Sequence, residues 1–163
     1  MDFSKLSTGD KVVAGSGIVL FISIFLTWFK FDYGFGTITE SGTDYFFTAT
    51  FPAILGLVLI GYIFATKLSD SIKLPELPVE YPLAVLGVAG LAALLVILRL
   101  LIGGDDHGTD ALDRAYGLYI GTLAAIGLAA GAFLKFKEDG GELPTKGGST
   151  GGTTGDGGSA TPF

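Results

Sequence analysis

A long uncharged segment near the C-terminal end limits the possible folds of this chain more than any other feature. It runs from Ala115 to Phe136, and the twenty residues between Arg114 and Lys135 carry no charge. About 20 apolar residues are enough for a helix to cross the hydrocarbon core of a bilayer. The composition agrees, because 49% of the 163 residues are hydrophobic and the mean hydropathy is +0.59. We therefore predict an integral membrane protein.

Small residues gather on one side of this predicted helix. Gly117 with Gly121 and Gly127 with Gly131 form two G-x-x-x-G pairs. At about 100° per residue these glycines fall in one band along the helix, with Gly127 at its border. Helices in lipid associate mainly through close packing, so such a face is expected at the centre of a bundle. It would pack either against the other helices of the chain, which is the preferred interpretation, or against another copy or membrane protein.

Three further apolar segments complete the predicted fold, an all-α membrane protein with a bundle of four transmembrane helices. The predicted spans are residues 12–29, 45–66, 81–102 and 115–136, within a domain of residues 12–137. Residues 1–11 are a polar lead in which Ser7 and Asp10 predict a capping box. Residues 138–163 are rich in Gly, Ser and Thr and predict a disordered tail, because such a composition buries too little apolar surface to fold.

The distribution of basic residues predicts the orientation. Four spans place both termini on one side, and seven of the ten basic residues fall there, against Lys30, Arg99 and Arg114 on the other. Basic loops stay in the cytoplasm, so we expect cytoplasmic termini and a multi-pass protein of the plasma membrane. The net charge of −6 argues against nucleic acid as a partner, and the lack of Cys excludes disulfides and thiolate metal sites.

Two residues are predicted to anchor the outer interface. Trp28 ends the first span within an aromatic cluster of the kind that settles at headgroup level. Arg99 lies one turn from the end of the third span, where its side chain would snorkel outward and pair with Asp105 or Asp106. Between residues 30 and 44, polar and aromatic residues alternate, which is consistent with a short hairpin on the membrane surface.

The outer loop after the third span contains the main candidate ligands of a cation. Asp105, Asp106, His107 and Asp110 offer oxygen and imidazole groups within six residues. One interpretation is a weak divalent-cation site. The preferred one is a solvated acidic turn that caps the following helix, since the spacing of an EF-hand loop is missing.

A resemblance to a known group rests on LSTGDKVVAGSGIVLFISIFLTWF near the start and on the charged, then glycine-rich, exit of the last span. In these features the chain resembles small, uncharacterised four-span membrane proteins of high-GC Gram-positive bacteria. The resemblance implies a bacterial plasma membrane. That group has no established active residues to transfer to this sequence.

Three classes of function are consistent with these features. A structural or accessory membrane protein, packing with or tethering other membrane components, fits best. A small pore-forming or transport protein, such as a holin-like oligomer, is the alternative and would need polar faces that line water. An embedded enzyme comes third, because no stretch forms a catalytic motif; we expect no enzymatic activity and no cofactor. The expected partners are the lipid bilayer and either another membrane protein or a second copy of the chain.

Overall fold

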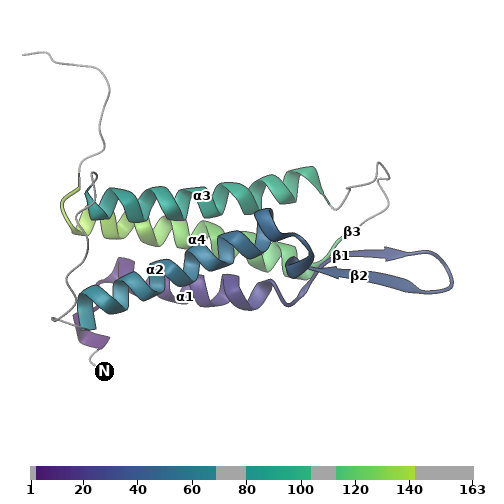
Figure 1. The fold of residues 1–163 in the computed structure, drawn as a ribbon, viewed down its shortest axis with the longest axis horizontal. Helices are drawn as coiled ribbons and strands as arrows, with labels where there is room; N and C mark the ends of the chain where they lie inside the picture. The colour runs from purple at the N-terminus through teal and green to yellow at the C-terminus, as the bar shows by residue number, and fades with distance from the viewer. Residues whose placement is uncertain (1–2, 69–79, 104–112, 142–163) are drawn as a thin grey trace, which may run out of the picture.

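Four α-helices form the body of the computed structural model, which describes residues 3–68, 80–103 and 113–141 (Figure 1). Consecutive helices run in opposite directions, and a small β-sheet stands at one end of the bundle (Figure 1). The helices are α1 (Thr8–Ser23), α2 (Phe51–Leu68), α3 (Tyr81–Ile102) and α4 (Tyr116–Glu138). Short helical turns are η1 (Phe3–Lys5), η2 (Gly42–Asp44) and the π-helical η3 (Phe46–Thr50), which leads into α2.

The α4 helix is the centre of this bundle. It packs most extensively against α1 and next against α3, while α2 contacts α1 and α3. Figure 1 shows α4 running between α3 and α1. The side of α4 that meets its neighbours is built from small and apolar residues, among which Ala125, Leu128 and Ala132 are fully buried. Small side chains allow the helix backbones to approach closely.

Three helices of the described residues are long and apolar enough to cross a membrane: Phe46–Lys67, Tyr81–Ile102 and Tyr116–Glu138. The third predicted span matches its helix residue for residue, and α4 extends two residues beyond the predicted end at Phe136. Pro82 lies in the first turn of α3, where its missing N–H leaves no hydrogen bond unmade. The chain is thus mostly helical, with helices suited to a multi-pass membrane protein.

The first predicted span, residues 12–29, is wrong in its last third, residues 24–29. The α1 helix ends at Ser23, and its 16 residues correspond to a length of about 24 Å. Residues 24–26 turn, and strand β1 begins at Thr27. Aromatic and β-branched residues are favourable in a strand that pairs with neighbouring strands. Hydropathy alone does not distinguish such a strand from a helix, because both are uncharged and apolar.

The β-sheet corrects the all-α prediction. Strand β1 (Thr27–Asp32) lies between β2 (Thr37–Ser41) and β3 (Asp113–Arg114), and both pairings are antiparallel. The aromatic alternation after Lys30 therefore belongs to a hairpin, as predicted, with Gly34 in its turn at a φ of +78°. Because β3 follows the segment after α3, the sheet joins the two connections at this end of the bundle, and the hairpin projects beyond the helices (Figure 1).

Candidate functional site

The glycine face of α4 lies against α1. A Cβ atom at Gly117 would lie 2.5 Å from the Thr27 carbonyl oxygen, just beyond α1, and one at Gly131 would lie 2.8 Å from the Val13 amide nitrogen. A Cβ at Gly121 would meet Ser23 Oγ at 2.9 Å, and one at Gly127 would meet Ser16 Oγ at 2.6 Å. All four predicted packing glycines thus face the same neighbouring segment of this chain. The contact is intramolecular, so this face is not available to a partner.

Trp28 is buried and does not lie at an exposed interface, which corrects its predicted role as an anchor. Its side chain has no exposed surface, and its indole Nε1 donates a hydrogen bond to the Ser23 carbonyl oxygen at 2.7 Å. The cause is a β-bulge, because residues 27–29 of β1 stand opposite only Ser41 and Glu40 of β2. A bulge disrupts the alternation of side chains, so the adjacent Trp28 and Phe29 both point into the protein.

Arg99 is also buried, with only 6% of its surface exposed, instead of reaching outward as predicted. Its guanidinium carbon lies 3.5 Å from the centre of the Tyr45 ring and 5.3 Å from that of Phe29. These two rings meet edge to face, and the Tyr45 hydroxyl donates a hydrogen bond to Glu40. Cation–π contacts are worth about 2 kcal/mol when desolvated. Arg99 therefore ties α3 to the base of the sheet.

The predicted cation loop lies outside the described residues, as do Asp105, Asp106, His107 and Asp110 individually. The predicted pairing of Arg99 with Asp105 or Asp106 therefore involves residues outside the described part of the chain. Within residues 3–68, 80–103 and 113–141, no group of three or more His, Asp or Glu side chains is arranged to hold a metal ion.

A buried ion pair joins α1 and α4 at the opposite end of the bundle. Lys135 Nζ lies 2.8 Å from Asp10 Oδ1 and 3.3 Å from Asp139 Oδ2, and Asp10 is fully buried. Asp10 also completes the predicted capping box, since its other oxygen accepts a hydrogen bond from the Ser7 amide. The Gly9 amide donates to Glu138 Oε2 at 3.1 Å. The sequence offered a weak signal, because Lys135 falls inside the predicted fourth span, one residue before its end, and Asp10 lies just before the first.

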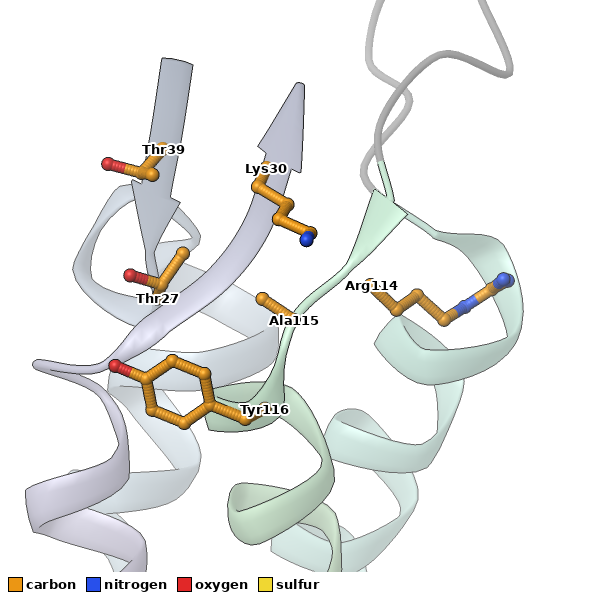
Figure 2. Close-up of a pocket in the computed structure, with 6 residues that line it drawn as sticks. All are labelled: Thr27, Lys30, Thr39, Arg114, Ala115 and Tyr116. Carbon is orange, nitrogen blue, oxygen red and sulfur yellow. The ribbon is translucent and has the colours of Figure 1, made fainter. Parts of the chain in front are cut away.

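A pocket of about 340 Å³ lies where the sheet meets the start of α4 (Figure 2). It is lined by Thr27, Lys30, Thr39, Arg114, Ala115 and Tyr116. Lys30 is the register partner of Thr39 on β2 and of Asp113 on β3. Figure 2 shows the Lys30 side chain projecting from β1 toward Ala115. The distribution of charges predicts that Lys30 and Arg114 share one side of the membrane, but nothing in the sequence predicts that they line one pocket.

Arg114 closes one side of the pocket and binds the end of α3. Its Nε donates to the Leu100 carbonyl oxygen at 2.8 Å and its Nη2 to that of Leu101 at 3.5 Å. In Figure 2 its guanidinium points away from the other lining residues. Carbonyls in the last turn of a helix lack partners within the helix, and basic side chains are favourable there. Arg114 thus fixes β3 to α3.

Comparison of the chain with protein-family models, with curated proteins and with solved structures gives no match.

Proposed function

We propose that this protein is a structural or accessory protein of the plasma membrane, whose helices hold the three-stranded sheet as a docking platform for another membrane protein. The observation that carries the proposal is the combination of a firmly held sheet base with an exposed tip. The base is held by Trp28, Arg99 and Arg114. At the tip, Phe35 is 99% exposed, and Tyr33 and Ile38 are about half exposed. Large apolar side chains exposed together mark interaction sites.

The proposed arrangement in the membrane follows from the exposed side chains of the helices. Large apolar residues are exposed along the bundle, for example Val58 on α2, Leu94 on α3 and Leu123 on α4. Such a surface suits contact with lipid. The shorter α1 would form a fourth crossing together with residues 24–29, of which Ile24, Trp28 and Phe29 are buried in the protein and Phe25 is exposed. The bias of basic residues then supports cytoplasmic termini and an external sheet.

The alternative is a small pore-forming oligomer of the holin type. The described helices have few polar groups that could line such a pore. The buried hydroxyls of Ser23 and Thr122 donate to the carbonyl oxygens of Leu20 and Leu118, one turn earlier in their own helices. Such hydroxyls are satisfied without water. A conducting pore needs polar groups that face its lumen.

Crosslinking from the hairpin tip tests the proposal. A photoreactive phenylalanine analogue is placed at Phe35 and, as a control, at Leu123 on the lipid-facing side of α4, and membranes of the native host are irradiated. We expect a defined protein adduct from position 35 and none from position 123. The purified protein should give no conductance in liposomes. Conductance together with no adduct from position 35 would favour the pore.

A further inference from the structure

We infer that the pocket between β1 and the start of α4 binds the phosphate of an anionic phospholipid of the outer leaflet. The inference rests on the proposed membrane arrangement and names a ligand for a site next to the docking platform. Three observations support it: the charge of the pocket, its hydroxyl groups, and the apolar strip that leads away from it.

The charge of the pocket favours an anion. Lys30 and Arg114 are two of its six lining residues, and none of the six is acidic. Asp113, the register partner of Lys30, is exposed and does not line the pocket. Because Arg114 binds the end of α3, Lys30 is the cation that can meet a ligand directly. A lysine ammonium is a common partner of phosphate in proteins.

Three other residues of the lining carry hydroxyl groups. Thr27, Thr39 and Tyr116 each bring one to the lining, and hydroxyls donate readily to phosphate oxygens. Ala115, the residue at the N-cap of α4, lacks a capping side chain, so the positive end of a 23-residue helix also opens beside the pocket. The lining thus combines a cation with neutral donors, the chemistry that holds a phosphate monoanion.

An apolar strip on α4 favours a lipid ligand over a free phosphate, because only a lipid has acyl chains that can contact it. Tyr116, Tyr119, Ile120 and Leu123 are all exposed and share one face of the helix at spacings of three and four residues. This strip begins at the pocket and runs toward the middle of a helix that is apolar enough to cross a membrane. A headgroup in the pocket would leave its acyl chains along this strip. A soluble phosphate would gain nothing from it.

The test uses the purified full chain in phosphatidylcholine nanodiscs, to which phosphatidylglycerol, or separately glycerol phosphate in solution, is added. Native mass spectrometry and the melting temperature report binding. We expect phosphatidylglycerol to bind as one retained lipid and to raise the melting temperature, with no effect of glycerol phosphate. Lys30→Gln should weaken lipid binding by about tenfold or more, since hydrogen bonds to charged groups contribute about 1.5 kcal/mol or more.

Lys11→Gln is the matched control, because Lys11 is an exposed lysine on α1 at the other end of the bundle. It should keep the affinity of the unmodified chain. Equal loss in Lys30→Gln and Lys11→Gln would overturn the site, and equal binding of glycerol phosphate would overturn the choice of a lipid. Lys30→Gln must melt as the unmodified chain does in phosphatidylcholine alone, which shows that the fold is intact. No partner is present, so the result is independent of whether the hairpin docks a protein.

Discussion

At the scale of single residues, glycines determine how closely α4 approaches its neighbours. The Cβ of an alanine at position 117 would lie 2.5 Å from the Thr27 carbonyl oxygen, which belongs to the backbone and has little room to move. Overpacking of this kind costs about 1 to 3 kcal/mol. We therefore expect Gly117→Ala to lower the free energy of unfolding by this amount, measured by denaturant titration in detergent.

Gly87→Ala is the matched control, since Gly87 is an exposed glycine of α3 with no atom within 4 Å of an added Cβ. Alanine is a better helix former than glycine by about 1 kcal/mol, so this variant should be neutral or more stable. If both variants lose the same stability, the close contact at Gly117 does not hold α4 in place.

The ion pair of Asp10 and Lys135 gives a second prediction at this scale. Removing one member of a buried pair leaves an uncompensated charge and costs about 3 to 5 kcal/mol. Asp139 also lies near Lys135, so Asp10→Asn should fall at the lower end, near 3 kcal/mol. The double variant Asp10→Asn/Lys135→Met should regain much of that loss. Lys137→Met, which changes an exposed lysine, should have little effect in the same titration; a comparable loss there would refute a special role for the pair.

For single residues, the sequence predicted which positions pack closely better than it predicted which side chains contact one another. The band of glycines on α4 follows from helical periodicity alone. The burial of Trp28 and Arg99 could not be predicted in this way, because it depends on a β-bulge and on two aromatic rings from other elements. Lys135 and Asp10 are 125 positions apart in the sequence, and only the antiparallel packing of α1 and α4 brings them together.

At the scale of elements, hydropathy located the helices well and could not detect a strand. The bounds of α3 follow from Pro82 and the apolar run after it. The end of α1 does not follow from composition, because residues 24–29 are as apolar as the helix before them. Residues 27–29 are extended because they pair with β2 and β3, which come from segments later in the chain.

The hairpin should be divisible into a tip that is dispensable for folding and a base that is required. Replacing residues 33–36 by Asn-Gly, a favoured two-residue hairpin turn, should leave the unfolding free energy in detergent unchanged, since the side chain of Phe35 is almost wholly exposed. Trp28→Ala should cost about 3 to 5 kcal/mol, because it empties a fully buried site. A destabilised tip variant would mean that the tip packs on the protein.

The end of α4 allows a similar comparison by truncation. A stop after Gly141 keeps the contacts of Glu138 with Gly9 and of Asp139 with Lys135. We expect this chain to melt in detergent as the full protein does, because the composition beyond it predicts no packed structure. A stop after Phe136 removes both contacts and should lower the melting temperature. A large loss from the first truncation would show that residues 142–163 contribute to the fold.

At the scale of the whole molecule, the two ends of the helix bundle differ in charge and in exposed surface. One end carries the buried ion pair and most of the lysines, and the other carries the sheet, the pocket and the exposed hairpin tip. Both the docking proposal and the lipid site require that these two ends lie on opposite sides of the membrane. They also require that the sheet faces outward.

Labelling of single cysteines tests this polarity most directly. The chain contains no Cys, so each introduced thiol is unique. Phe35→Cys places one at the hairpin tip, while Lys11→Cys and Lys137→Cys, both at exposed positions, place one near the start of α1 and the end of α4. With a membrane-impermeant maleimide on intact cells, we predict labelling of position 35 alone, and labelling of positions 11 and 137 only after the membrane is opened. Labelling of position 11 together with position 35 on intact cells would show that α1 does not cross. Labelling of positions 11 and 137 without position 35 would reverse the orientation, and either result would contradict the account.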